Sequence, residues 1–171
     1  LEAGFRLNSD VVMTSSDPHE PPFPASQVSI RALQSDTDWQ QAVELQVVCR
    51  EAEFTEGEYR EFRQREMARY REMTSSSRGD WYGAFIGSQL VSDLGLFHQG
   101  GIGRYQSVET HPDFRRRGIA STLVYESARQ AIAKYSIHTL VIVAEEASSA
   151  ARLYGSLGFQ PTEKQVGVEW W

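Results

Sequence analysis

One stretch, residues 104–144, constrains the fold more than any other part of the chain. It begins with a strand pattern at 104–110, crosses Pro112, continues as an amphipathic helix pattern over about 116–134, and ends in the apolar run HTLVIVA at 138–144. A strand, a helix and a second strand in this order form a right-handed crossover, which places the two strands parallel to one another. The continuous apolar run predicts that the second strand is central in its sheet and covered on both faces.

The flanking sequence predicts mostly antiparallel neighbours for this unit. Apolar runs at 81–86 and 89–98, joined by a Gly-Ser turn, predict with 104–110 a three-stranded meander. The remaining patterns predict a strand at 28–32, helices at about 35–51, 55–73 and 147–157, and a last strand at 163–171. Thr55 and Glu58 have the spacing of a capping box. We therefore expect an α/β (α+β) fold with the order β-α-α-β-β-β-α-β-α-β, in which helices flank a mixed, mostly antiparallel sheet.

The first 26 residues follow a different pattern from the rest. Residues 5–13 predict a short strand, and the segment SSDPHEPPFPAS that follows is rich in proline and polar residues, which is typical of a linker or an extended arm. We expect residues 1–26 to form an N-terminal arm, as the remnant of an upstream segment, and residues 27–171 to form the domain.

Composition narrows the classes of function. The 171 residues carry a formal net charge of −6, which disfavours a nucleic-acid binder and suits a cationic substrate. No apolar run is long enough to span a membrane. Cys49 is the single cysteine, so we expect no internal disulfide, no metal site, and a reducing, cytoplasmic location. Cys49 lies in an apolar run, which favours a small core residue. For the assembly of the protein, a homodimer is an open alternative to a monomer.

The junction between the strand at 104–110 and the helix that follows predicts an anion-binding site. Pro112 ends the strand, and Arg115-Arg116-Arg117-Gly118-Ile119-Ala120 opens the helix. The first turn of a helix has free N–H groups and a partial positive charge. Gly118 and Ala120 lack bulk, so a phosphate can approach the backbone, and the arginines add charge-assisted hydrogen bonds. This arrangement suits a diphosphate.

These residues resemble a known family. Arg-x-x-Gly-x-Ala after a strand and a Pro-x-x step resembles the acyl-CoA motif of the GNAT superfamily of N-acetyltransferases, Gln/Arg-x-x-Gly-x-Gly/Ala. Leu153–Phe159 resembles a second motif, Leu-Tyr-x-x-x-Gly-Phe, and the order of elements extends the likeness over residues 27–171. The resemblance implies acetyl-CoA as cofactor, with its pantetheine arm along the strand that ends at Thr110. The cofactor-binding residues it implies are Val108, Glu109, Thr110, Arg115, Arg116, Arg117, Gly118, Ile119, Ala120, Ser121 and Tyr154.

The resemblance also implies roles in catalysis. Tyr154 matches the tyrosine near the CoA sulfur, where a phenol can protonate the leaving thiolate, although it could instead only pack there. Glu109 is our candidate for the general base. Arg104 occupies the position where some relatives have a glutamate. Other candidate bases are Glu51, Glu53, Glu56 and His98, or a chain of water molecules, whereas His111 is interpreted as a turn residue.

The chain departs from the family at Ala147, where relatives often have an asparagine that helps to hold the cofactor, although Ala150 matches a small residue of the motif. The expected function is direct acetyl transfer to a primary amine. The alternatives are a non-catalytic acyl-CoA-binding or interaction module and an RNA-binding arginine loop, which the acidic charge disfavours. The acceptor is expected near the connection of the first two helices, with aromatic residues that could equally fill the core: Trp81, Tyr82, Tyr105, Trp170 and Trp171.

Overall fold

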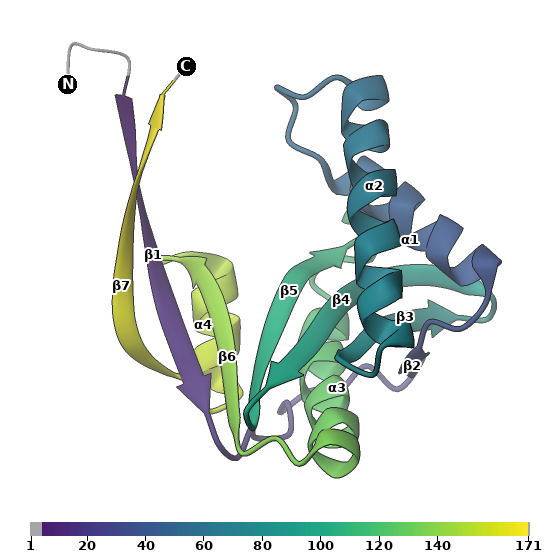
Figure 1. The fold of residues 1–171 in the computed structure, drawn as a ribbon. Helices are drawn as coiled ribbons and strands as arrows, with labels where there is room; N and C mark the ends of the chain where they lie inside the picture. Colours follow the sequence, from purple (N-terminus) through teal and green to yellow (C-terminus); the bar gives the residue numbers. More distant parts are fainter. Residues whose placement is uncertain (1–4, 171) are drawn as a thin grey trace.

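A single seven-stranded sheet organises the computed structural model, which describes residues 5–170 and the side chains of residues 7–168 (Figure 1). The strands are β1 (Phe5–Ser15), β2 (Ser29–Ala32), β3 (Gly79–Ile86), β4 (Gln89–Gln99), β5 (Ile102–Thr110), β6 (Thr139–Glu145) and β7 (Gln160–Trp170). The helices are α1 (Asp36–Cys49), α2 (Glu56–Ser75), the short 3₁₀ helix Pro112–Phe114, α3 (Ile119–Tyr135) and α4 (Ser149–Ser156). From β2 onward the order of elements is the one that the sequence predicts.

The strands lie in the order β2-β3-β4-β5-β6-β1-β7. The pair β5–β6 is parallel and the other pairs are antiparallel, which confirms the crossover through α3. Helices cover both faces. One apolar cluster joins α1 and α2 to β3 and β4 around Trp81 and Phe85. A second cluster joins α3 and α4 to the opposite face around Leu94, Leu123 and Phe159. The mixed, mostly antiparallel sheet flanked by helices is thus confirmed.

β1 is an integral strand of the sheet. The sequence predicts a short strand over residues 5–13, and the structure has one that extends to Ser15, between β6 and β7. Asp10–Ser15 pair with β6, whereas the pairing with β7 runs from Phe5 to Thr14. The outer half of β1 therefore extends past the end of β6 together with β7. We call this projecting two-stranded part the β1–β7 arm (Figure 1).

The structure corrects several local predictions. α3 begins at Ile119 and not near Arg116, because Arg116 and Gly118 both have positive φ values, which a helix does not accommodate. The predicted capping box at Thr55 is wrong, since the Thr55 hydroxyl donates to the Glu58 carboxylate and caps no backbone N–H.

A complete capping box is found instead at the start of α1, between Ser35 and Asp38. β6 was expected to be covered on both faces, but its residues alternate between buried and half-buried.

Candidate functional site

The site is centred on the place where β5 and β6 diverge. Their pairing is limited to Ile102–Arg104 with Thr139–Val141, so residues 105–110 have no partner on that edge. The ladder between β4 and β5 is also irregular here, and Ser107 has a left-handed φ of 45°. Such a bulge redirects the end of a strand. This edge of residues 105–109 is therefore open to an extended molecule, which could bind as an added strand, whereas the Thr110 carbonyl already accepts from Arg115 and Cys49.

The loop before α3 presents backbone N–H groups beside this open edge. Arg116 (φ 60°) and Gly118 (φ 72°) bend the chain into a left-handed turn that leads directly into the helix. Helix geometry leaves the N–H groups of its first turn, including Ile119, Ala120 and Ser121, without intrahelical partners. Consecutive amides of this kind form an anion-binding concavity. The local structure thus agrees with the expected diphosphate site.

The three arginines of the loop have different surroundings. Arg115 Nε donates to the Thr110 carbonyl at 2.9 Å, which turns its side chain back toward the end of β5. Arg117 donates to the Asp113 carbonyl at 2.8 Å and lies over the Phe114 ring. Arg116 makes no side-chain hydrogen bond and no cation–π contact with the residues that the structure describes. Among the three, Arg116 is therefore the best placed to bind an anion.

A cavity of about 430 Å³ joins the loop, the end of β5 and α4. All of the expected cofactor-binding residues line it except Arg117. The structure adds Phe114, Ser149, Ala150 and Leu153 to the lining. The apolar character of Leu153 and the small size of Ala150 are visible in the sequence as part of the second motif. Phe114 and Ser149 have no comparable signal.

Tyr154 projects from α4 into this cavity and is 6% exposed. Its ring packs against Phe159. Burial raises the pKa of its phenol well above the usual value, and the nearby charge of Glu109 raises it further. The phenol therefore stays protonated at neutral pH, as a proton donor requires.

Glu109 lines the same cavity from β5 and is half-buried. Burial raises the pKa of its carboxyl group. The nearby Cys49 thiol and the charges of Arg63 and Arg115 oppose this effect, whereas the charge of Glu51 adds to it.

Cys49 and Arg63 are neighbours of the site that the sequence does not reveal. Cys49 ends α1, and its thiol donates to the Thr110 carbonyl at 3.4 Å. Burial raises the pKa of this thiol to about 12, so Cys49 stays protonated. Arg63 on α2 donates to the Tyr59 hydroxyl at 2.7 Å. Both residues lie near enough to Glu109 to lower its pKa, because α1 and α2 pack on this face of the sheet.

Several other candidates lie elsewhere. The core contains Trp81, Tyr82 and Tyr105. These aromatic residues therefore fill the core, which was the alternative to lining an acceptor site. His98 stacks on the Tyr135 ring. The side chains of residues 170 and 171 lie outside the described part of the chain.

The remaining charged candidates are spread over different elements. Glu56 pairs with Arg60 on α2, and His111 accepts a hydrogen bond from the Asp113 N–H in the turn. Glu51 and Glu53 lie in the α1–α2 loop, and Arg104 is exposed on β5.

Ala147 does not line the cavity. It lies at the end of β6 with a φ of 62°, a conformation that asparagine adopts more readily than alanine. Within residues 5–170, no group of three potential metal ligands lies together, and no helix is long and apolar enough to cross a membrane.

Comparison with known proteins defines the class. The family model described as FR47-like protein matches residues 83–168, about half of the chain, and includes β5, the α3 loop and Tyr154. The chain belongs to the GNAT superfamily of N-acetyltransferases. Within it, the chain is a member of the FR47-like family. No curated protein sequence matches it.

Solved structures share this fold at low identity. A GCN5-related N-acetyltransferase from Sphaerobacter thermophilus superimposes with a TM-score of 0.68 at 19% identity, over 98% of this chain and 53% of the other. The PaiA N-acetyltransferase from Thermoplasma acidophilum, solved in complex with coenzyme A, superimposes with a TM-score of 0.65 at 18% identity, over 84% of this chain and 99% of the other. A conserved protein of unknown function from Staphylococcus epidermidis gives 0.74 at 13% identity, over 96% and 62%. The chain spans only 53–66% of four of the longer structures.

Proposed function

We propose that the chain is an acetyl-CoA-dependent N-acetyltransferase that transfers the acetyl group directly to a primary amine. The observation that carries this proposal is the convergence of three features on one cavity. They are the unpaired amides at the start of α3, the open edge of β5, and the buried phenol of Tyr154. A cavity that only stabilises the fold has no need of all three.

The residues present fit coenzyme A. The amides of residues 118–121 and the Arg116 guanidinium suit a diphosphate. The backbone of residues 108–110 suits the amide groups of a pantetheine arm, and Phe114 and Leu153 offer an apolar wall. When bound, acetyl-CoA supplies a thioester, which is an activated acyl group.

Glu109 and Tyr154 handle the protons of the reaction. The amine enters the reaction in its neutral form, its ammonium proton having been released to solvent, and Glu109 accepts the proton that the nitrogen loses as it attacks the carbonyl carbon. A backbone N–H of β5 polarises the carbonyl oxygen. As the new C–N bond forms and the C–S bond breaks, the Tyr154 O–H donates its proton to the departing sulfur. The nitrogen loses one proton and the sulfur gains one, and a proton that returns from Glu109 to Tyr154 through solvent restores both side chains.

The direct test combines two measurements on the purified chain. Calorimetry should detect coenzyme A binding, and a thiol reagent should detect free CoA when acetyl-CoA is mixed with a panel of amines. Binding together with thiol release supports the proposal. Binding without release for any amine would favour a non-catalytic acyl-CoA-binding module, and absence of binding would refute both.

A further inference from the structure

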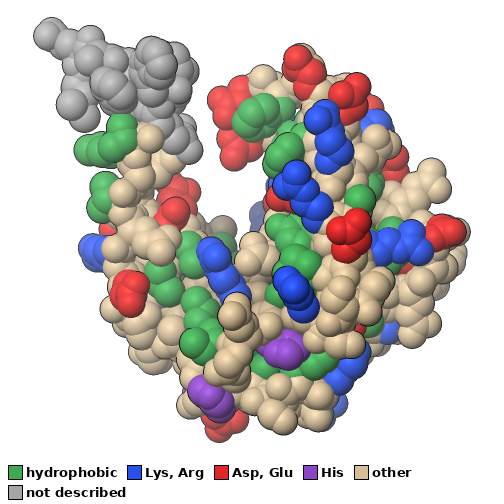
Figure 2. Space-filling view, viewed as in Figure 1, with side chains coloured by type: hydrophobic (Ala, Val, Ile, Leu, Met, Phe, Trp, Pro, Cys, Tyr) green, Lys and Arg blue, Asp and Glu red, His purple; other side chains and the backbone are tan. Residues whose placement is uncertain are grey.

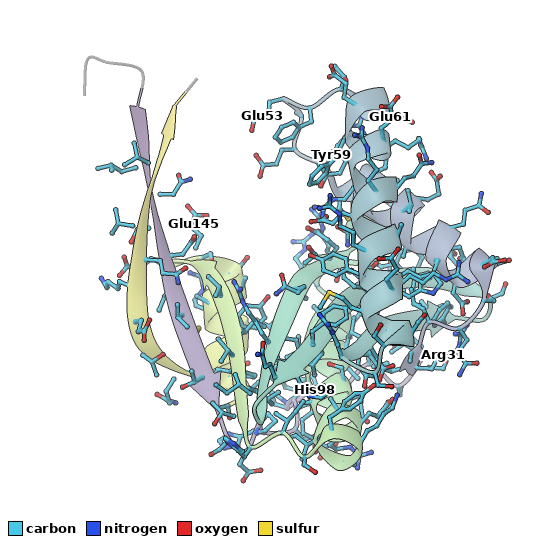
Figure 3. The ribbon with its side chains drawn as sticks, in the orientation of Figure 1. Arg31, Glu53, Tyr59, Glu61, His98 and Glu145 are labelled. Atoms are coloured by element: carbon cyan, nitrogen blue, oxygen red, sulfur yellow. The ribbon has the colours of Figure 1, made fainter. Side chains whose placement is uncertain are left out.

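A second cavity, of about 680 Å³, opens between the β1–β7 arm and the α1–α2 loop. Figure 2 shows this face of the molecule hollowed between the two, and in Figure 3 Glu53 and Tyr59 lie across the gap from Glu145. We call this cavity the arm cleft. Its lining consists of Leu7, Asn8, Ser9, Asp10, Glu51, Glu53, Phe54, Glu145, Glu146 and Ala147.

The described lining of the arm cleft is strongly acidic. Five of its lining residues are acidic and none is basic. Glu146 is neutralised by Lys164 and accepts a hydrogen bond from Ser9. The other four carboxylates make no side-chain hydrogen bond or ion pair with any residue that the structure describes. Like charges gathered around a concave surface repel one another and concentrate cations there.

One wall of the arm cleft is a free strand edge. The Ser9 carbonyl accepts from the Glu146 N–H at 2.9 Å, on the edge of β1 that faces β6. In an antiparallel ladder alternate residues point to the same edge, so the N–H and C=O of Leu7 also point there. The pairing with β6 ends at Asp10, and within the described residues nothing pairs with this edge of Leu7. Such an edge is a template for another strand.

The arm cleft is connected to the proposed reaction centre through Glu51. Glu51 lines the cleft and lies two residues after Cys49, whose thiol donates to the carbonyl of Thr110 in the wall of the reaction-centre cavity. On the same side, Phe54 packs against Tyr59 with ring centroids 5.7 Å apart. A molecule in the cleft would thus lie between the loop and the arm, with Glu51 on the side nearest the cavity that Glu109 lines.

We propose that the arm cleft binds the acceptor, and that the acceptor is a positively charged, extended peptide segment. Its backbone would pair with β1 at Leu7, its basic side chains would face the four free carboxylates, and a lysine amine would reach Glu109. This inference rests on the proposed function. The free strand edge favours a peptide over a polyamine, because a polyamine offers charge but no main chain to pair.

Peptide binding provides the test. The probe is a fluorescent, end-capped peptide with a central lysine and arginines on both sides, measured by anisotropy with and without coenzyme A. We expect the double variant Glu53→Gln/Glu145→Gln to weaken binding about tenfold at low salt and less at high salt. N-methylation of alternate peptide nitrogens should weaken binding to a similar extent. Glu61→Gln, which removes a 74% exposed carboxylate of α2 directed away from the cleft, is the matched control.

Three outcomes would overturn the proposal: unchanged binding to the double variant, unchanged binding of the N-methylated peptide, or tighter binding of spermidine than of the peptide. Thiol release from acetyl-CoA separates this test from that of the proposed function. Release with a small amine, without peptide binding, refutes the peptide groove alone. Peptide binding without release for any amine refutes the transferase activity.

Discussion

Asp93 on β4 and Glu109 on β5 are register partners, immediately beside the irregularity in the ladder between the two strands. Asp93 is fully buried, and its two carboxylate oxygens accept hydrogen bonds from Gln46 Nε2 at 2.8 Å and Trp81 Nε1 at 3.0 Å. Burial raises its pKa to about 8, and the charge of Glu109 contributes. Two acidic groups therefore lie together beside the proposed reaction centre.

This burial predicts an unusual dependence of stability on pH. Between an unfolded pKa of about 3.9 and the folded pKa of about 8, the folded chain keeps a proton on Asp93 that the unfolded chain loses. Because the folded state binds more protons, the contribution of Asp93 to the free energy of unfolding falls as pH rises through this window. Asp93→Asn removes that slope, so the variant should gain stability relative to the wild type as pH rises.

Urea unfolding at several pH values measures this difference. Near pH 4 we expect the two proteins to agree within about 1–2 kcal/mol, since a rotated Gln46 amide can accept a hydrogen bond from the amide group that replaces the Asp93 carboxyl group. If the free energies of unfolding of the two proteins kept a constant difference across the whole pH window, Asp93 would be ionised in the folded state.

Glu109→Gln should abolish most of the turnover. The substitution keeps the size of the side chain but removes the proton acceptor, and loss of a general base costs about 100-fold or more. Affinity for coenzyme A should change little, because β5 offers its backbone. In the wild type the rate should rise with pH through the raised pKa of Glu109. Initial rates of thiol release measured across pH test both expectations, with Glu61→Gln as the control. Full activity of Glu109→Gln would assign the proton transfer to Glu51 or to water.

Tyr154→Phe isolates the hydroxyl group. Because the Tyr154 hydroxyl makes no hydrogen bond with any described residue, removing it should change stability by less than about 1 kcal/mol. Turnover should fall at least about tenfold if the phenol donates a proton. The matched control is Tyr105→Phe, which deletes a buried hydrogen bond to the Val124 carbonyl at 2.8 Å. We expect Tyr105→Phe to lose stability but keep its turnover. If Tyr154→Phe instead lost stability and kept its turnover, Tyr154 would have a packing role.

The cavity at the start of α3 could be predicted because the residues that form it are local in the sequence. The arginine loop, Gly118 and the strand before them are adjacent in the chain, so a short motif records their geometry. Tyr154 is distant in sequence, but it is recorded by a second motif of its own. The start of α3 was misplaced by three residues because a left-handed arginine, Arg116, has no compositional signal.

The surroundings of Glu109 could not be predicted in this way. Cys49 and Arg63 lie on different helices, and the packing of α1 and α2 on the sheet brings both near enough to influence the pKa of Glu109. The position of β1 is similarly non-local. An apolar strand pattern indicates a strand but does not select its neighbours, which here are β6 and β7 at the opposite end of the chain. The arm cleft depends on both of these features.

Gly118→Ala tests how strictly the loop geometry is required. Gly118 has a φ of 72°, and a Cβ atom there would lie 2.6 Å from the Phe23 carbonyl oxygen. Residues 23–25 also bind the loop region through the Ala25 N–H, which donates to the Thr122 hydroxyl at 2.9 Å. The added methyl group must displace this backbone or shift the amides of α3. We expect a loss of about 1–3 kcal/mol in stability and weaker coenzyme A binding.

Thermal unfolding measures the change in stability, and calorimetry measures the change in coenzyme A binding. The control is Gly57→Ala, at an open position of α2, which should instead stabilise the chain by about 0.5–1 kcal/mol. Wild-type affinity in Gly118→Ala would mean that the diphosphate binds away from these amides.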